Sequence, residues 1–388
     1  MTSNDQWFED ETDPATEDVA ITEYDIVASP NDFNVKTLFD FIDSGVVRIP
    51  PFQRNFVWDL RRASKLIESL IMGLPIPQVF LYEKERNNFL VIDGQQRLLS
   101  LYYFMKLRFP RQAKRTALRR RLLEGELQQP DSLLADNEYF THFKLSFPHD
   151  PGSAVNPLDG LDYQSLGPLG SQFDLRTLRI VIVKQMSPEG ADSIYEIFNR
   201  LNTGGVNLSP QEIRMSMFHS PFLEMLARIN FDQRWRRIVG REDADLHLRD
   251  VEFLLRGLAL TAEGDSYSPS MIKFLNGFAR RGQDYTSEEI GHMEQLLEGF
   301  FDACEDLPAS AFNSQSGKFA VSIFDAVFAA VCENAYQEQS AAVPAIAETD
   351  LQSLKTDSEF IEATQSRTTG SGNVQTRISK AREHLIGS

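Results

Sequence analysis

The sequence has little cysteine and no long apolar run. Its 388 residues include two cysteines, Cys304 and Cys332, whose spacing does not match a metal-binding pattern. We therefore expect a protein of a reducing compartment. No stretch approaches the roughly 18 consecutive apolar residues of a membrane-spanning helix, and the N-terminus lacks the basic and apolar regions of a signal peptide. These absences predict a soluble, cytoplasmic protein without membrane contact.

A basic excess is also missing. The formal net charge at pH 7 is −17, which argues against a protein that coats nucleic acid by bulk electrostatic attraction. The charge is unevenly distributed, because residues 1–25 carry nine acidic and no basic residues, a composition that predicts a disordered acidic tail. Residues 106–121 instead carry eight basic and no acidic residues.

This basic run is the best candidate in the sequence for contacting a polyanion. The residues expected to contact DNA are Arg115, Arg119, Arg120 and Arg121. A solvated helix with a basic face explains the same run equally well, so both interpretations stay open.

The hydrophobic pattern predicts an α+β fold in two main parts. A helix over residues 60–72 precedes strands over 78–82 and 89–93, which pair across a polar hairpin, and the run LRIVIV at 178–183 joins the same sheet. Later apolar stripes recur at helical spacing between short loops. The expected divisions are an acidic tail at 1–25, a mixed α/β domain at 26–205 with a helical and loop insertion at about 106–172, an all-α domain at 206–340, and a linker with a C-terminal helix at 341–388.

Residues 89–104 read FLVIDGQQRLLSLYYF, which predicts a buried strand, a tight turn and a helix. The turn places Gly94 at the helix start, where unpaired N–H groups and the helix dipole attract anions. Gly94 lets a phosphate approach the backbone, Arg97 can grip two phosphate oxygens, and Asp93 can hold Mg²⁺ or orient water. The alternative is a turn capped by Asp93 with a solvated Arg97, which needs no ligand.

The loop over residues 48–58 is too rich in proline and aromatic residues for a regular helix. Its polar residues Gln53 and Arg54 lie between three apolar anchors, Phe52, Phe56 and Trp58. This arrangement would fix the loop while presenting polar side chains to a site, although a packed surface turn explains the anchors equally well.

The segment around residue 200 combines a helix end with a helix start. Asn199 and Asn202 stand at the end of a helix predicted for 190–202, followed by Gly204, which closes the helix and frees polar residues to face a site. Ser209 then combines with Pro210 and Glu212 as a capping serine, a proline at the first helical position and a glutamate three residues after the cap.

Four stretches in order over about 165 residues resemble one known family. They are IPPFQRNFVW at 49–58, GLPIPQVFL at 73–81, VIDGQQRLLSL at 91–101 and FNRLNTGGVNLSPQEIR at 198–214. Together they resemble the GmrSD-type N-terminal domain family and, within it, the S-type subunits of modification-dependent restriction systems. The core of that family is similar to ParB and sulfiredoxin. The likeness to sulfiredoxin is one of fold, because Gln95 and Gln96 stand where its cysteine would be.

The resemblance implies a domain that binds and hydrolyses nucleoside triphosphates with Mg²⁺ and senses or gates attack on foreign, base-modified DNA. The implied catalytic residues are Asp93, Gln96, Arg97 and Arg54, with Asp93 at the Mg²⁺ ion or the attacking water and Arg54 neutralising developing charge. The implied nucleotide-binding residues are Gln53, Arg54, Gly94, Gln95, Gln96, Arg97, Asn199 and Asn202.

Two features of other nucleases and NTPases are missing. Many relatives fuse this domain to an HNH nuclease, but the six histidines here are scattered and fit no such pattern. A nuclease, HNH or other, should therefore be a separate partner subunit. A Walker-type G-x-x-x-x-G-K-[ST] motif is also absent, which excludes a P-loop NTPase at the level of motifs.

The main hypothesis is therefore an NTP-hydrolysing, DNA-sensing subunit of a restriction or phage-defence system. A second hypothesis is a regulatory protein that binds DNA or a partner when nucleotide is bound and has negligible turnover. A third is a scaffold with a decayed pocket. The nucleotide base, the DNA modification and the oligomeric state stay open at this point, and a homo-oligomer is one of the alternatives.

Overall fold

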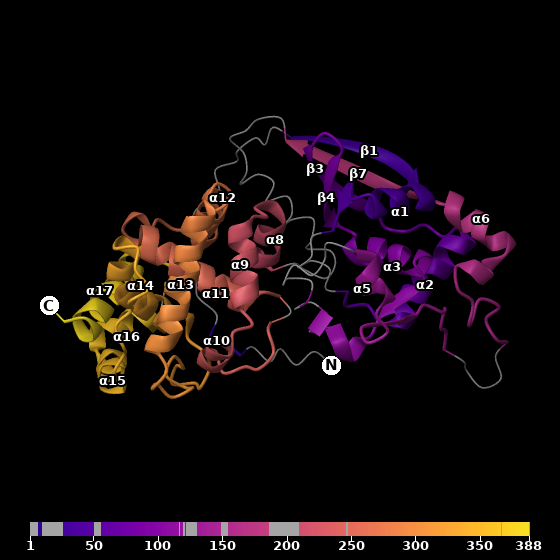
Figure 1. Cartoon of the computed structure of the whole chain (residues 1–388). Coiled ribbons are helices and arrows are strands. Elements are labelled where there is room, and N and C mark those ends of the chain that lie inside the picture. Colours follow the sequence, from indigo (N-terminus) through magenta and orange to yellow (C-terminus); the bar gives the residue numbers. More distant parts are fainter. Residues whose placement is uncertain are drawn as a thin grey trace. The chain divides into compact units, whose positions relative to one another are not determined.

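A computed structural model of the chain describes residues 7–9, 26–49, 56–115, 117–118, 121, 130–148, 154–185, 209–245, 247–365 and 367–387 (Figure 1). The chain divides into two compact units. Glu23–Leu208 form the sheet unit, and Met1–Thr22 with Ser209–Ser388 form the helical unit. Among the described residues, no helix has both the length and the apolar character needed to cross a membrane.

The sheet unit is built on a five-stranded sheet with the strand order β1-β7-β3-β4-β2. The strands are β1 Ile26–Asn34, β2 Val47–Arg48, β3 Val79–Glu85, β4 Asn88–Asp93 and β7 Thr177–Gln185. β3 pairs antiparallel with β4 and parallel with β7, which confirms the predicted hairpin and the third strand. β1 was not expected from the sequence. It is an edge strand with four consecutive exposed residues and contains Pro30, so it lacks a period-two apolar pattern.

Helices cover one side of this sheet (Figure 1). They are α1 Val35–Asp43, α2 Leu60–Met72, α3 Gln95–Met105 and α6 Pro168–Leu175. α2 begins where the Asp59 side chain accepts a hydrogen bond from the Arg62 backbone N–H, and it ends at Gly73 with φ 75°. Its apolar stripe faces the core, as the sequence predicts, with Ile67 and Ala63 fully buried.

The insertion expected at about 106–172 contains a small sheet that the sequence pattern did not indicate. β5 Arg108–Pro110 pairs antiparallel with β6 Phe140–His142. Short helices flank it: η1 Gln112–Lys114, α5 Pro130–Ala135 and η2 Gln164–Leu166. Phe104 of α3 joins this insertion to the main core, because its ring lies 5.2 Å from that of Phe143 and 5.6 Å from that of Phe173.

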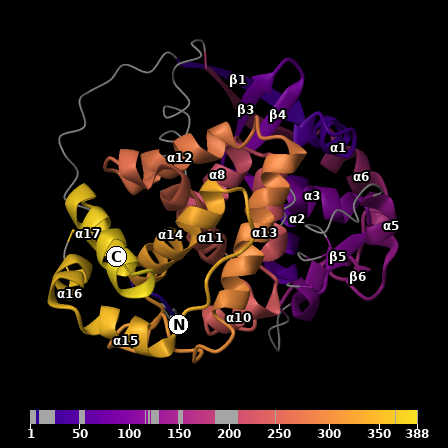
Figure 2. The same ribbon diagram turned by 60° about the vertical axis from the view of Figure 1, so that its left-hand side comes forward.

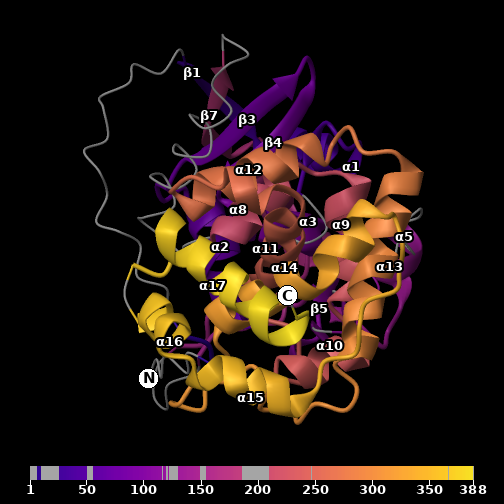
Figure 3. The same cartoon turned by 90° about the vertical axis from the view of Figure 1, so that its left-hand side faces the viewer.

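In the helical unit, α11, α13 and α17 pack against α14 (Figures 2 and 3). Its helices are α8 Pro210–Met217, α9 Pro221–Ile229, α10 Gln233–Ile238, α11 Arg249–Glu263, η3 Gly264–Ser266, α12 Met271–Arg281, α13 Ser287–Ala303, α14 Val321–Gln337, α15 Glu348–Thr356, α16 Ser358–Gln365 and α17 Ser371–Leu385. α11 and α17 both contact α14. Gly257 of α11 permits the close approach, because a Cβ there would lie 2.9 Å from the Phe328 ring. The mixed α/β part followed by an all-helical part confirms the predicted fold class.

Two parts of the helical unit differ from the expected divisions. Trp7–Glu9 fall in the segment expected to be disordered, yet Phe8 is buried and bridges Phe319, and the Glu9 backbone N–H donates to the Phe319 carbonyl at 3.0 Å. Residues 341–388 were expected to form a linker and one helix, but α15, α16 and α17 all pack there. The boundary expected at residues 205 and 206 lies outside the described residues.

Candidate functional site

Two of the predicted motifs follow neighbouring strands that end at the same edge of the sheet. β2 and β4 run parallel, with Val47 opposite Phe89 and Arg48 opposite Leu90. Their carboxyl ends therefore point the same way. The loop that carries Gln53 and Arg54 follows β2, and the turn at Asp93 to Arg97 follows β4.

Gly94 gives this turn its shape and leaves the start of α3 open. Its φ of 95° is in the left-handed region, and an added Cβ would lie 2.6 Å from Val79 Cγ2. Gly94 is the N-cap residue of α3 and, having no side chain, makes no side-chain cap hydrogen bond. Backbone N–H groups and the helix dipole favour an anion at such a helix start, so anion binding there stays a prediction.

Asp93 and Arg97 form an ion pair across this turn. Arg97 Nη2 lies 2.6 Å from Asp93 Oδ2, and Arg97 Nη1 donates to the Pro77 carbonyl at 2.9 Å. The Arg97 side chain is 12% exposed and that of Asp93 is 32% exposed. The structure thus differs from the expectation of a guanidinium free to grip phosphate, because both Arg97 Nη atoms already have protein acceptors.

Gln96 connects the turn to the loop after β2. Its Oε1 accepts hydrogen bonds from the backbone N–H of Val57 at 2.9 Å and of Trp58 at 3.3 Å. Gln96 was predicted as a catalytic and nucleotide-binding residue, whereas its side-chain oxygen here holds the loop. Gln53 and Arg54 lie outside the described residues, a few positions before this contact.

Arg115 holds the same two loop residues from their carbonyl side. Its Nη1 donates to the Val57 carbonyl at 3.1 Å and its Nη2 to the Trp58 carbonyl at 2.6 Å. Burial lowers the pKa of this guanidinium from its ordinary value. We call Gln96 and Arg115 with the Val57–Trp58 backbone the loop bracket. Arg115 was expected to contact DNA, but its Nη donors are used inside the sheet unit.

Phe56 and Trp58 anchor the loop, as predicted. The Phe56 side chain is buried, and its ring lies 5.4 Å from each of the Tyr103 and Phe109 rings in edge-on contacts. The Trp58 ring stacks against the Arg62 guanidinium at 4.6 Å. These contacts fix the loop immediately after residues 53 and 54.

The basic run is largely matched by acceptors from residues 134–138 and from α1. Lys106 pairs with Asp43 at 2.7 Å, and Lys114 pairs with Glu138 at 2.8 Å. Arg108 and Arg111 donate to the Asn137 side chain and carbonyl, each at 3.0 Å. Arg121 lies 3.4 Å from Asp136 and over the Tyr139 ring. The described part of the run is therefore not an open cationic patch, and Arg119 and Arg120 lie outside it.

Of the other predicted nucleotide-binding residues, Gln95 is the first residue of α3. Asn199 and Asn202 lie in 186–208, outside the described ranges. Asp93 and Val181 lie level in the sheet, because both pair with Phe80 of β3. β7 continues past this level to Gln185, which pairs with Ile26 of β1. Where the structure describes the chain, no three His, Cys, Asp or Glu residues gather as a metal site.

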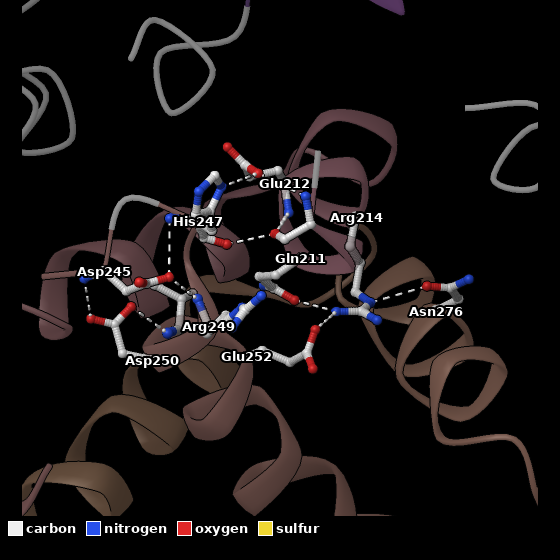
Figure 4. Close-up of polar contacts among 11 residues, drawn as sticks. Gln211, Glu212, Arg214, Asp245, His247, Arg249, Asp250, Glu252 and Asn276 are labelled. Carbon is white, nitrogen blue, oxygen red and sulfur yellow. Dashed lines mark hydrogen bonds and ion pairs between the residues drawn. The ribbon is translucent and has the colours of Figure 1, made fainter. Parts of the chain in front are cut away.

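A second polar network, unexpected from the sequence, surrounds α8 in the helical unit (Figure 4). Arg214 is fully buried, and its Nε donates to Asn276 Oδ1 at 3.0 Å while its Nη1 lies 3.1 Å from Glu252 Oε2. Gln211 also accepts from Arg214 Nη1. These partners join α8 to α11 and α12, so we assign the network a structural role. The polar residues of QEIR at 211–214 could have indicated this network. The partners of Arg214, however, lie 38 and 62 residues away in the sequence.

The start of α8 is the capping box that the sequence predicts. The Ser209 hydroxyl accepts from the Glu212 N–H at 3.1 Å, and the Glu212 carboxylate accepts from the Ser209 N–H at 2.7 Å. Glu212 also lies 3.3 Å from His247 Nδ1, and this hydrogen bond raises the pKa of His247.

The fold and the site together define an α+β domain with an open helix start after its central hairpin, continued by a helical unit. Residues 35–219 match the model of the family described as GmrSD restriction endonuclease, N-terminal domain. Residues 35–219 therefore form a domain of the GmrSD-type N-terminal family, and the family's description ties it to restriction systems.

A curated relative is similar to a short part of the chain. The relative is an uncharacterized protein, MJ0686, of Methanocaldococcus jannaschii, which is 32% identical over 97 residues. The match covers 18% of this chain and 17% of that protein. No solved structure matches.

Proposed function

We propose that this protein is the NTP-binding, NTP-hydrolysing and DNA-sensing subunit of a modification-dependent restriction or phage-defence system. It would act with a separate nuclease subunit. The family match over 35–219 supports the restriction setting. A ParB- and sulfiredoxin-like core is part of the same proposal.

The observation that carries the proposal is the start of α3 at Gly94, directly after Asp93. The backbone N–H direction in the first turn of a helix and the helix dipole favour phosphate oxygens there. Gly94 permits close approach, since it has no side chain between the phosphate and the backbone. The loop bracket fixes the segment that follows Arg54 against the same turn, so Arg54 is a candidate to neutralise charge on the transferred phosphate.

The residues present fit a Mg²⁺ ion that arrives with the nucleotide better than a resident ion. Mg²⁺ is commonly bound by one or two carboxylates together with substrate phosphates and water. In the described chain Asp93 is the carboxylate at this turn. When bound, the ion would neutralise phosphate charge. Asp93 would hold or orient it, and Arg97 would position the Asp93 carboxylate.

The test is phosphate release by the full-length protein with each of four ribonucleoside triphosphates and Mg²⁺. The assay is run with and without modified DNA and repeated with Arg97→Ala and Asp93→Asn. Arg86→Ala is the matched control, because Arg86 is an exposed arginine of the same unit in the β3–β4 hairpin. Turnover that is lost in the two site variants and kept in the control supports the proposal. Equal turnover in all four proteins contradicts it.

A specific observation favours a second candidate, a nucleotide-switched binding protein with negligible turnover. The Asp93 carboxylate is neutralised by Arg97, which also holds the Pro77 carbonyl. A carboxylate engaged in this way is a poor metal ligand until the guanidinium moves. Saturable NTP binding without phosphate release, weakened by Arg97→Ala, would support this second function.

A further inference from the structure

The helical unit contains a cavity of about 620 Å³ that neither the α3 turn nor the Arg214 network lines. Its walls come from the start of α14, one face of α16, the turn at 314–318 and the Phe8–Glu9 segment. Lys355 of α15 and Thr368 complete the lining, in the region of α15 and α16 seen in Figure 3. All of these residues belong to one compact unit.

Lys355 brings to this cavity a positive charge that has no carboxylate partner. Its Nζ donates to the carbonyls of Ala311 at 2.9 Å and Asn313 at 2.8 Å, both of which are neutral acceptors. No ion pair to Lys355 occurs within the described ranges. Burial lowers the pKa of its ammonium group. A partly desolvated ammonium group with a third N–H to donate attracts an anion.

Thr368 supplies a second polar group that lacks a partner. The residue is 6% exposed, and its Oγ1 has no hydrogen-bond partner in the part of the chain that the structure describes. A buried hydroxyl without a partner is costly, so a ligand acceptor would stabilise it. The seventeen-residue helix α14 also begins at this cavity, and its N-cap residue Ala320 offers no capping side chain.

The cavity also has an apolar part. Phe360 and Ile323 are both buried residues that line it, together with Phe8. The lining includes two lysines, Lys318 and Lys355, against one carboxylate, Glu9, which already accepts from the Ser316 hydroxyl at 3.0 Å. This local positive excess occurs in a chain of net charge −17.

We infer that this cavity binds a small organic anion with an apolar body. The carboxylate, phosphate or sulfonate head would lie at Lys355, Thr368 and the start of α14, and the body would lie against Phe360 and Ile323. The inference does not depend on nucleotide chemistry in the sheet unit, so the two proposals can fail separately.

The experiment uses 8-anilinonaphthalene-1-sulfonate, which combines an aromatic body with an anionic head, in a fluorescence titration of the full-length protein. We expect saturable one-to-one binding. Lys355→Met should weaken it about tenfold or more and Thr368→Val about fivefold, as expected for the loss of a charged and of a neutral hydrogen bond. Thr364→Trp should weaken binding by occupying part of the cavity, which Thr364 lines. Lys273→Met is the matched control and should bind like the wild type, because Lys273 is an exposed lysine of α12 in the same unit.

Lys355→Met removes two hydrogen bonds to the 311–313 segment, so circular dichroism and thermal unfolding must accompany every titration. If that variant is unfolded, Thr368→Val and Thr364→Trp still test the site. Displacement of the probe by inorganic phosphate from the wild type supports an anion subsite. The inference is overturned if the wild type shows no saturable binding, or if a folded Thr364→Trp protein binds the probe as tightly as the wild type.

Discussion

Gly94 is the residue on which the geometry of the turn depends most. Its positive φ and its distance to Val79 are two separate reasons why no other residue fits there. The φ is a backbone property that glycine tolerates and other residues resist. The contact with Val79 comes from the neighbouring strand β3. A comparison with another glycine can therefore separate the two effects.

Gly45 provides that comparison, since its φ of 77° is also positive but an added Cβ would meet nothing within 4 Å. We expect Gly45→Ala to lower the free energy of unfolding by about 1 kcal/mol, the cost of the left-handed conformation. Gly94→Ala should cost about 3 kcal/mol, because the overlap with Val79 is added. Urea unfolding measures both values. Equal losses in the two variants would show that the contact with Val79 relaxes freely.

Arg115 is a positioning residue in our interpretation, and its removal should loosen the loop locally. Arg115→Ala deletes two hydrogen bonds to the Val57 and Trp58 carbonyls. At about 1 kcal/mol for each bond, amide hydrogen exchange at Val57 and Trp58 should accelerate at least tenfold. Arg111→Ala is the control, since Arg111 donates to the Asn137 carbonyl and not to the loop. Unchanged exchange in Arg115→Ala would show that Arg115 does not hold the loop.

At the scale of elements, α3 and α8 begin in opposite ways. α8 has a complete capping box, so Ser209 and Glu212 bond to each other's backbone N–H groups. α3 begins at a glycine without a capping side chain. The difference supports a structural role for the start of α8 and is consistent with our proposal of anion binding at the start of α3, although both starts lie in stretches that carry the family resemblance.

The Glu212–His247 contact adds a pH-dependent term to the stability of the α8 start. The pKa of His247 is raised in the folded protein, chiefly by its hydrogen bond to Glu212. The contribution is therefore fully present below about pH 6.5, the unfolded value, and is lost as the pH rises through the folded pKa. We expect His247→Gln to lower stability by less than about 1 kcal/mol at pH 6, because this side chain is half exposed.

Urea unfolding of His247→Gln and the wild type between pH 5.5 and 9 checks this expectation. The difference should disappear at the alkaline end. Glu212→Gln is the companion variant, because Glu212 also caps α8 and its loss should lower stability at every pH. A His247→Gln effect that grows with rising pH would contradict the expected direction of the pH dependence.

At the scale of the whole molecule, charge is organised by tertiary pairing. In the basic run over 106–121, Lys106, Lys114 and Arg121 pair with carboxylates of α1 and of the segment before β6. Arg119 and Arg120 lie outside the described residues and stay candidates for contact with DNA, whereas Arg121 already pairs with Asp136.

Charge reversal of Arg119, Arg120 and Arg121 to glutamate should therefore weaken DNA binding at low salt by at least tenfold. The slope of log affinity against log salt should fall by about 2, one for each of Arg119 and Arg120. Fluorescence anisotropy with duplex DNA at several salt concentrations measures both quantities. Lys114→Glu is the control, since Lys114 pairs with Glu138. Binding that the triple variant leaves unchanged at low salt would refute the role of this run.

Local features of the sequence were enough to predict much of the sheet unit and the start of α8. Runs of apolar residues and Gly94 predict the β3–β4 hairpin, the α3 helix and strand β7, which is rich in β-branched residues. The capping box follows from a spacing of three residues. The edge strand β1 and the β5–β6 pair could not be predicted in the same way, because their stability comes from partner strands and their residues show little alternation.

The sequence by itself determined which residues form the turn at Asp93–Arg97 and that this turn opens a helix. The spacing of apolar residues, the position of a glycine and the residues that start a helix each depend on a few neighbours in the sequence. These features can therefore be recognised from the sequence alone. Only the tertiary structure decided what the polar side chains do. Arg97 reaches Pro77 across 20 residues, Gln96 reaches Val57 across 39, and Arg115 reaches Val57 across 58. A side chain's partner depends on which segments the packed core brings within hydrogen-bond distance, and local sequence does not encode that distance.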